Sequence, residues 1–399
     1  MICEHLENVA EILNGFAFKS SLYCDTGIRV LRIANVQDGF IADSIPCFYP
    51  NTMYEQIKPY ELFEGDLLMS LTGNVGRVGI VKKELLPAAL NQRVCCIRPN
   101  DRVSSKFLYF YFLQKSFSHD CIVNSKGVAQ LNLSTKWLAN VNVPVPPFPE
   151  QQRIVAKIEE LFAELDNSVA MLKKVKEQLE VYRQAVLEKA FEIADESVLL
   201  REYIEKPTYG TSQKCTYDKK KNSIAVYRIP NISDYGGHID HSDLKYAVFS
   251  NEDKAKYVLK ENDILIIRSN GSEDVVGQVA LVRNKDINGL FAGYLIRLRI
   301  KQNVSLCAKY LFYFLQSFKA RKYIVSTAKS TNGINNINAE EIQNISIPFC
   351  EHEKQIEAVT FIENNLSLCR QLNENTSVGL KQADALRQSI LKKAFEGEL

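Results

Sequence analysis

One run of residues, 150–192, constrains the fold of this chain more than any other. Its apolar residues recur in alternating steps of four and three, and only Ser168 fills a gap in that spacing. Such a seam, kept over more than four heptads, is typical of a coiled-coil helix. The prolines at 144, 146, 147 and 149 predict that the helix begins near Glu150. A helix of this length spans roughly 60 Å and needs a partner helix. Its seam consists of Ile154, Ile158, Leu161, Leu165, Leu172, Val175, Leu179, Tyr182 and Val186.

The partner is predicted within the same chain, because the run has a second copy. Residues 386–396 match 182–192 at seven of eleven positions, at a constant offset of 204. The identities include residues outside the seam, so an internal repeat explains them better than shared heptad character does. Thr376 and Gly379 replace the apolar seam residues Leu172 and Val175. We therefore expect a loosened or bent segment there.

The repeat extends through the rest of the chain in the same order, with offsets that drift from 196 to 204. One unit is thus a globular module followed by a long helix. We predict an α+β fold in which two mixed α/β globular modules alternate with two long helices that pair as a coiled coil. The matching segments are 31–36 with 227–232, 66–69 with 263–266, 76–81 with 277–282, 110–114 with 312–316, and 143–146 with 345–348. The predicted domains are 1–147, 148–194, 195–347 and 348–399.

Short runs rich in Val and Ile predict the strands of the first module. Two aromatic runs, 107–117 and 310–318, predict buried helices, because they are too apolar to serve as exposed stacking platforms for bases. The expected strands are 30–33, 67–71, 78–81 and 94–97.

Composition sets the class of protein. The chain is 46% apolar and 24% charged, as in soluble globular proteins. No apolar run is long enough for a membrane span, and the first residues do not resemble a signal peptide. The ten cysteines include no Cys-x-x-Cys pair, and adjacent Cys95 and Cys96 are expected in the core. These features favour a reducing, cytoplasmic compartment.

Charge is unevenly distributed between the two modules. Residues 1–145 hold 14 Lys and Arg against 13 Asp and Glu, a net charge of +1, whereas residues 197–345 hold 22 against 15, a net charge of +7. A basic module favours polyanions, through phosphate contacts that release counterions. For the first module, an ordinary mixed surface explains the charges equally well.

Two loop regions carry polar residues that a core does not explain. Residues 72–77 match 268–273, and 124–132 match 327–336. Asn, Gln and Arg can pair with the edges of adenine or guanine, and Lys and Ser suit phosphates and sugars. Single positions fit ordinary turns slightly better, but the loops as groups favour binding. The candidate residues for nucleic acid are Lys19, Thr72, Asn74, Arg77, Lys126, Gln130, Asn132, Arg268, Ser269, Asn270, Ser272, Lys329, Asn332, Asn335 and Asn336.

Motifs for catalysis are missing from the sequence. It contains no phosphate-binding Gly-x-x-x-x-Gly-Lys-Ser/Thr loop, no Asn/Asp-Pro-Pro-Tyr of an amino-methyltransferase and no Gly-x-Gly cofactor turn after a strand. His238 and His241 are the only close pair of histidines, and a loop suits them better than a metal site. We therefore predict no catalytic residues, metal or cofactor in this chain.

The sequence resembles the DNA-specificity subunit of type I restriction-modification systems, over essentially its whole length. The resemblance is carried by residues 9–20, 64–68, 147–155 and 393–399, together with the tandem order. The second half departs from the family pattern at 207–210 and 353–356, so contacts cannot be transferred between the halves residue by residue.

The resemblance implies a function in a complex. The two modules would be target recognition domains in a pseudo-twofold repeat, each reading one half of a split double-stranded DNA target. The two long helices would pack antiparallel, set the spacing between the half-sites and dock two modification (methyltransferase) subunits. Up to two restriction subunits would join them. S-adenosylmethionine, ATP and magnesium would be used by those partners. Because the loops differ between the halves, the target should be bipartite and asymmetric.

Two other classes of protein fit the sequence less well than a DNA-specificity subunit does. A self-contained methyltransferase or nuclease is disfavoured by the missing motifs and by the use of the whole chain in the repeat. A coiled-coil adaptor that binds only proteins is disfavoured by the polar loops and the basic second module. An adaptor would show no sequence preference on DNA.

Overall fold

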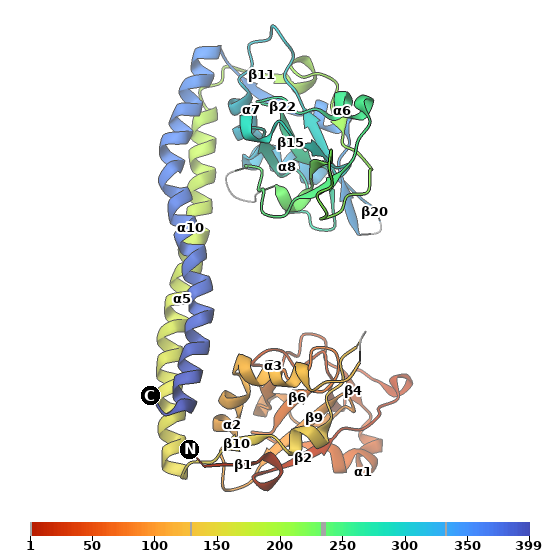
Figure 1. Ribbon diagram of the computed structural model, residues 1–399, viewed down its shortest axis with the longest axis vertical. Coiled ribbons are helices and arrows are strands. Elements are labelled where there is room, and N and C mark those ends of the chain that lie inside the picture. Colours follow the sequence, from red (N-terminus) through yellow and green to blue (C-terminus); the bar gives the residue numbers. More distant parts are fainter. Residues whose placement is uncertain (1, 128–129, 233–236, 332) are drawn as a thin grey trace. The chain divides into compact units, whose positions relative to one another are not determined.

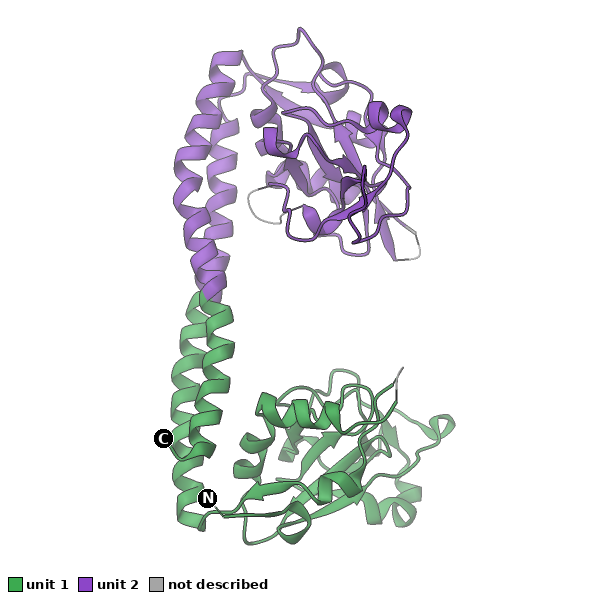
Figure 2. Ribbon diagram, viewed as in Figure 1, with its two compact units in different colours: residues 1–172, 379–399 green, residues 173–378 purple. Residues whose placement is uncertain are grey.

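The computed structural model describes residues 2–127, 130–232, 237–331 and 333–399. The chain divides into two compact units (Figure 2). Unit 1 consists of residues 1–172 and 379–399, and unit 2 consists of residues 173–378. Each unit combines one α/β module with a part of each of the two long helices (Figure 1).

The two long helices are α5 (Phe148–Phe191) and α10 (His352–Glu396). Within unit 1, Arg387 pairs with Asp166. Within unit 2, the Tyr182 hydroxyl donates to Asn365 at 3.3 Å. Also within unit 1, Arg153 donates to the Leu399 carbonyl, so residue numbers rise along α5 as they fall along α10 and the helices are antiparallel, as the resemblance implies. Among the described residues, no helix is long and apolar enough to cross a membrane.

The module of unit 1 is built on two four-stranded sheets, with strand orders β2-β9-β6-β7 and β4-β3-β8-β5. All pairs in the first sheet are antiparallel, and β3 runs parallel to β8 in the second. A two-stranded sheet, β1-β10, leads into α5. The elements are β1 (Cys3–His5), β2 (Ala10–Asn14), β3 (Ile28–Leu31), β4 (Phe48–Tyr49), α1 (Tyr54–Ile57), β5 (Glu61–Leu62), β6 (Leu67–Ser70), β7 (Val78–Ile80), β8 (Ala88–Leu90), β9 (Val94–Pro99), α2 (Ser105–Phe112), α3 (Lys115–Val123), α4 (Thr135–Ala139) and β10 (Asn142–Pro144).

The module of unit 2 repeats this plan with sheets β12-β19-β15-β17 and β14-β13-β18, and with β11-β22 beside the helices. It adds a small sheet, β16-β21-β20. The elements are β11 (Glu196–Leu199), β12 (Thr208–Tyr209), β13 (Ile224–Tyr227), β14 (Lys245–Ala247), α6 (Asn251–Tyr257), β15 (Ile264–Ile267), β16 (Ser269–Asn270), β17 (Val279–Leu281), β18 (Leu290–Phe291), β19 (Leu295–Leu298), α7 (Ala308–Leu315), α8 (Phe318–Thr327), β20 (Lys329–Thr331), β21 (Ile334–Asn336), α9 (Ala339–Gln343) and β22 (Ser346–Phe349).

The same polar contacts recur in both modules. Arg98 holds the buried carboxylate of Asp66 with two hydrogen bonds of 2.8 and 2.7 Å. Arg299 holds Asp263 in the same way at 2.7 and 2.6 Å. Because a buried carboxylate is costly unless it is paired, these contacts fix one strand against its neighbour at the same place in each module.

One glutamine anchors each long helix to its own module. Gln151 is fully buried, accepts a hydrogen bond from the backbone N–H of Ser104, and donates to the carbonyls of Arg102 and Pro146. Gln355 makes the corresponding bonds with Cys307, Ser305 and Cys350. The similarity of the two helix starts in the sequence thus has a physical cause, since one side chain satisfies three backbone groups.

The aromatic runs form buried helices, but two details of the sequence prediction are wrong. The run 107–117 is split into α2 and α3, with Leu113 and Gln114 between them. The offset of the repeat in this region is 203 rather than 202. Phe395 packs on Phe107 and Tyr111, and Phe191 packs correspondingly on Tyr310 and Phe314.

The segment of α10 expected to be bent is continuous helix in the structure. The Thr376 hydroxyl donates to the Leu372 carbonyl at 2.7 Å, which satisfies the hydroxyl within the helix. Asn373 is 8% exposed, and its Oδ1 atom has no hydrogen-bond partner among the described residues. The polar seam therefore does not break the helix, and its looseness stays a prediction.

The adjacent cysteines are both in the core, as expected. Cys95 and Cys96 are fully buried on β9. Burial raises the pKa of Cys95 to about 12 and also raises the pKa of Cys96. Both are therefore neutral, unreactive thiols near neutral pH.

Candidate nucleic-acid interface

In unit 1 the two predicted loops meet at the end of β6. Asn132 forms antiparallel bridges with both Thr72 and Lys126. The Thr72 hydroxyl lies 3.5 Å from Asn132 Oδ1, and the Gly73 N–H donates to the Leu131 carbonyl at 2.8 Å. The structure therefore brings Thr72 together with Lys126 and Asn132, although Thr72 lies more than 50 residues before them in the sequence.

The other candidates of unit 1 are placed differently. Arg77 is half-buried and donates to Gln37 Oε1 at 3.2 Å, so part of its guanidinium is engaged. Asn74 and Gln130 are exposed. Lys19 is exposed before the 3-10 turn Ser20–Leu22, and no hydrogen bond or ion pair of the described residues joins it to the two loops.

In unit 2 the loops form a small antiparallel sheet. Ser269 pairs with Asn336 and Asn270 with Asn335, while Lys329 pairs with Asn336 from the other side. Figure 1 shows β20 at the margin of its module. Lys329, Asn336 and Ser272 are exposed, whereas Ser269 and Asn270 are half-buried. The candidate Asn332 lies outside the described residues.

Arg268 and Asn335 organise this sheet from within. Arg268 donates to the Gly293 carbonyl at 2.9 Å and to Asn336 Oδ1 at 3.2 Å, and its guanidinium lies 5.0 Å from the centre of the Tyr209 ring. Asn335 is 8% exposed and points an N–H at the Gly271 carbonyl at 3.5 Å. Asn335 is thus better placed to support the loop than to contact a ligand.

The arrangement suits the edges of bases. The major groove of DNA admits a two-stranded β-ribbon, and Asn and Arg can each form two hydrogen bonds with a purine. In both modules, polar side chains stand on a loop pair held to the end of a buried strand, β6 or β15. A buried strand of this kind is a rigid scaffold that can position loop side chains for contacts.

A cavity of 390 Å³ beside this sheet is lined in part by residues that the sequence did not indicate as candidates for binding nucleic acid. His238, Asp240 and Gln278 line it together with the candidate Asn270. Burial, followed by the charges of Arg283 and Lys285, lowers the pKa of His238, which favours a neutral ring. Gln278 could have been found, since it occupies the repeat position of Arg77.

The second histidine of the close pair has a structural contact. His241 Nε2 lies 2.7 Å from the fully buried Asp286 carboxylate. Across the part of the chain that the structure describes, no three His, Cys, Asp or Glu side chains gather as metal ligands would.

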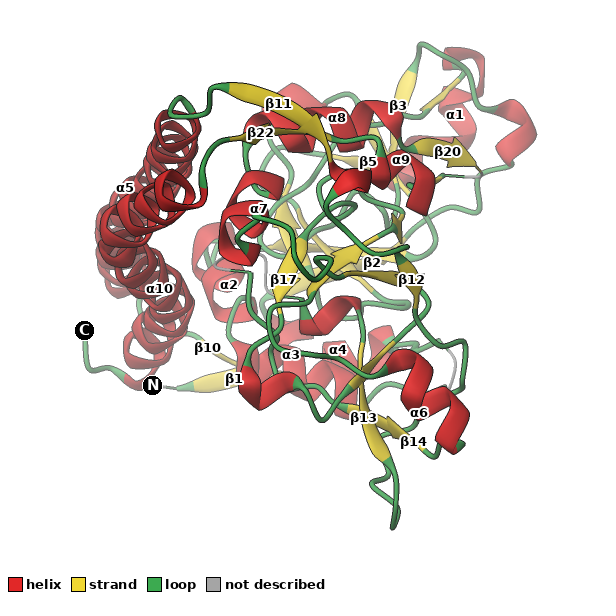
Figure 3. Cartoon of the chain, turned by 90° about the horizontal axis from the view of Figure 1, so that it is seen from above, coloured by secondary structure: helices red, strands yellow, loops and turns green. Residues whose placement is uncertain are grey.

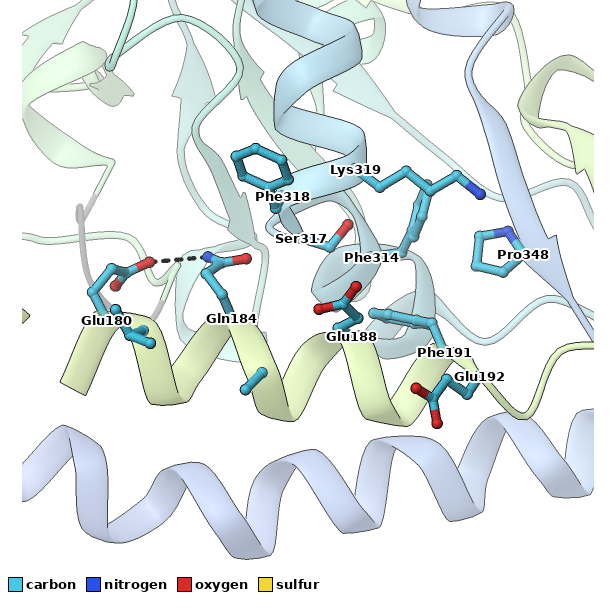
Figure 4. Close-up of a pocket in the computed structure, with 12 residues that line it drawn as sticks. Glu180, Gln184, Glu188, Phe191, Glu192, Phe314, Ser317, Phe318, Lys319 and Pro348 are labelled. Atoms are coloured by element: carbon cyan, nitrogen blue, oxygen red, sulfur yellow. Dashed lines mark hydrogen bonds between the residues drawn. The ribbon is translucent and has the colours of Figure 1, made fainter. Parts of the chain in front are cut away.

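A second surface feature of unit 2 is an apolar groove of 590 Å³ between α5 and α8. Figure 4 shows Gln184, Glu188 and Phe191 of α5 facing Phe314, Phe318 and Lys319. Phe318 is 69% exposed and Val181 is 72% exposed. Gln184 Oε1 is buried and has no hydrogen-bond partner among the described residues. Glu180 and Glu192 extend the acidic rim that Glu188 begins.

The chain belongs to the family described as the type I restriction modification DNA specificity domain. The family matches it twice, over residues 4–181 and 201–382, so the two matches follow the internal repeat.

Two similar proteins match this chain over nearly its whole length. The StySPI specificity subunit of Salmonella potsdam is 26% identical, with 99% of this chain and 88% of the relative covered. The EcoBI specificity subunit of Escherichia coli is 27% identical, with 99% and 85% covered. A chain solved in work on assembly and conformational transition of the type I R-M system has a TM-score of 0.73 at 19% identity, with 100% and 98% covered. The HsdS subunit of Thermoanaerobacter tengcongensis has a TM-score of 0.50 at 18% identity, with 100% and 97% covered. These solved structures share the fold.

Proposed function

We propose that this chain is the DNA-specificity subunit of a type I restriction-modification complex, in which each module reads one half of a bipartite, asymmetric DNA target. The observation that carries the proposal is a conserved frame with divergent loops within one chain. The Asp–Arg pairs and the anchoring glutamines are the same in both modules. The loop residues at the ends of β6 and β15 differ.

Divergence limited to the loops has a direct chemical consequence. Thr72 and Arg77 in one module correspond to Arg268 and Gln278 in the other, and these side chains offer different donors and acceptors. Different donor and acceptor patterns select different base pairs in the major groove. The two half-sites should therefore differ in sequence, and the target should be neither continuous nor palindromic.

Catalysis would belong to partner subunits. We infer that two modification subunits dock on the helical parts of the chain and supply S-adenosylmethionine-dependent methyl transfer. Up to two restriction subunits would supply ATP- and magnesium-dependent cleavage. The apolar groove supports docking in unit 2, because an exposed Phe and Val beside an unpaired amide oxygen are typical of a protein interface. Its acidic rim would suit an amphipathic helix with basic flanks.

The test is co-expression of this chain with the neighbouring methyltransferase subunit, followed by single-molecule sequencing for methylated bases. We expect a split, asymmetric motif that appears only when this chain is present. A stable complex without any new motif would leave an adaptor as the better description. A continuous or palindromic motif would contradict the assignment of one half-site to each module.

A further inference from the structure

A lysine-rich loop in unit 2, residues 212–223, is separate from the small sheet β16-β21-β20 and its loops. It contains Lys214, Lys219, Lys220 and Lys221 against the single acidic residue Asp218, so its net charge is +3. All four lysines are exposed. These twelve residues supply a large part of the +7 net charge of the second module.

The structure holds this loop in place. Thr216 and Tyr246 exchange backbone hydrogen bonds of 3.0 and 2.7 Å, which fix the loop against β14. Lys245 Nζ lies 4.5 Å from the centre of the Tyr217 ring, and Lys219 Nζ lies 5.6 Å from that of Tyr246. β14 lies at the outer edge of its module (Figure 3). The rings therefore position two ammonium groups at an accessible edge.

No ion pair engages these lysines in the part of the chain that the structure describes. Among the described residues, none of Lys214, Lys219, Lys220, Lys221 and Lys245 has a carboxylate within ion-pair distance, whereas Lys309 and Lys354 of the same unit are paired. The charge of the loop is thus available to a ligand rather than neutralised within the unit.

The corresponding loop of unit 1 provides an internal comparison. Residues 17–27 occupy the same place, because Phe16 bridges Asn91 as Thr211 bridges Ala292, and Cys24 bridges Phe48 as Thr216 bridges Tyr246. The charged residues of that loop are Lys19 and Asp25, so its net charge is zero. The frame therefore folds without the lysines, and their concentration in one module calls for another explanation.

We propose that the lysine loop, together with Lys245, is a phosphate-binding site for duplex DNA that is present only in the second module. This inference rests on the proposed function and adds to it a division of tasks between the modules. Lys is a compact, strongly hydrated charge that suits phosphate oxygens, and a contact to phosphate carries no sequence information. The loop would raise affinity for any sequence and orient the duplex on the second module, while the loops after β15 discriminate between sequences.

The magnitude follows from counterion release. Each phosphate neutralised on B-DNA contributes about 0.9 to the slope of log affinity against log salt. Removing three contacting lysines should therefore lower that slope by about 2 to 3. The effect should be the same for the recognised duplex and for a scrambled one, so the ratio of the two affinities should stay unchanged.

The experiment uses the full chain assembled with its modification subunits. The loop variant is Lys219→Ser, Lys220→Ser and Lys221→Ser. The control is Lys58→Ser, Lys82→Ser and Lys83→Ser, which removes the same charge from exposed positions of the first module, outside the long helices and the candidate loops. Fluorescence anisotropy would measure the affinity for a labelled duplex carrying the motif and for a scrambled one, from low to high salt.

We expect the loop variant to lose slope on both duplexes, the control to keep it, and the methylated motif to stay the same. An unchanged slope, or an equal loss in the control, would overturn the phosphate site. A loss of assembly with the modification subunit at an unchanged slope would assign the loop to a protein partner instead. If the complex without substitutions binds the two duplexes equally well, the proposed function is wrong. The phosphate site is tested independently of that result, because the salt dependence of the affinity does not require a preference between the duplexes.

Discussion

The buried Gln151 is the residue on which the start of α5 most depends. Replacing it by Leu would leave the Ser104 N–H and the carbonyls of Arg102 and Pro146 without their partner. A buried group left unsatisfied costs about 1–3 kcal/mol. We therefore expect Gln151→Leu to lower the free energy of unfolding by at least that amount, measured as a lower denaturant midpoint for unit 1.

The neighbouring glutamine offers a matched control. Gln152 is exposed on the same turn of helix, so Gln152→Ala should change stability by less than about 0.5 kcal/mol. Equal midpoints for the two variants would show that the three hydrogen bonds of Gln151 contribute nothing net.

Arg268 is the candidate with the most defined geometry in unit 2. Its bonds to Gly293 and Asn336 and its stacking on Tyr209 hold the guanidinium at the end of β15. Replacing it by Ala should relax one base position in one half-site, since a good bidentate contact discriminates by about 1–3 kcal/mol. Methylome sequencing should show the other half-site unchanged.

The matched variant is Arg77→Ala, in unit 1. The Arg77→Ala variant should relax one base position in the half-site that the module of unit 1 reads. It should leave the half-site read by the module of unit 2 unchanged. Relaxation of both half-sites by either variant would contradict the assignment of one half to each module.

At the scale of elements, the groove between α5 and α8 distinguishes the two halves. By the repeat, Lys115 stands in unit 1 where Phe318 stands in unit 2, and Lys392 stands in place of Glu188. We expect Phe318→Lys to weaken the binding of one modification subunit at least tenfold, measured by native mass spectrometry as a shift from two bound subunits to one.

The control for this prediction is Lys115→Ser, at the corresponding position of the other unit. The Lys115→Ser variant should leave the binding of a modification subunit to unit 1 unchanged. Full occupancy by two modification subunits in the Phe318→Lys variant would show that the groove is not a docking face.

The seam of α10 carries the second prediction at this scale. Asn373 buries an unpaired amide oxygen, and Gly379 places its backbone against Leu172. We expect amide exchange around residues 373–379 to be faster than in the rest of α10, and Asn373→Leu to slow it, because the substitution removes a buried unsatisfied acceptor. The exposed Asn364→Leu is the control. Uniform protection along α10 in the unmodified chain would contradict the prediction.

The element scale also shows how far sequence reasoning reaches. The heptad spacing, the offset of 204 and the Pro-rich start predict both long helices, because helix periodicity is a local property. The register of the aromatic runs was missed by one residue, since Phe and Tyr repeat too closely to fix it. The pairs Asp66–Arg98 and Asp263–Arg299 join residues more than 30 positions apart and leave no local pattern. Of the candidate site residues, the structure brings Thr72, Lys126 and Asn132 together, and likewise Ser269, Asn270 and Asn336. The sequence could not foresee that Asn335 is buried.

At the scale of the whole molecule, one unit is continuous in the sequence and the other is not. Unit 2 is one continuous stretch, 173–378, whereas unit 1 needs residues 379–399 from the other end of the sequence. Ile390, Leu391 and Ala394 belong to the core of unit 1, and Phe395 packs on Phe107. We expect a chain that ends at Val378 to lose amide protection in unit 1 and to keep it in unit 2. Adding residues 379–399 as a separate peptide should restore protection, and equal protection of both units without it would contradict the prediction.

This arrangement reverses the usual order of events on the ribosome. The first module and the start of α5 are synthesised first, but the part of their core that Ile390, Leu391 and Ala394 cover stays open while the 206 residues of unit 2 are made. At roughly 5–20 residues per second, that delay is about 10–40 seconds. All of unit 2 is synthesised before residues 379–399, which complete the core of unit 1. A premature stop between residues 172 and 379 would thus release a chain with an open apolar face, which chaperones and proteases recognise. The cell would thereby remove incomplete copies before they could direct methylation to half of a target.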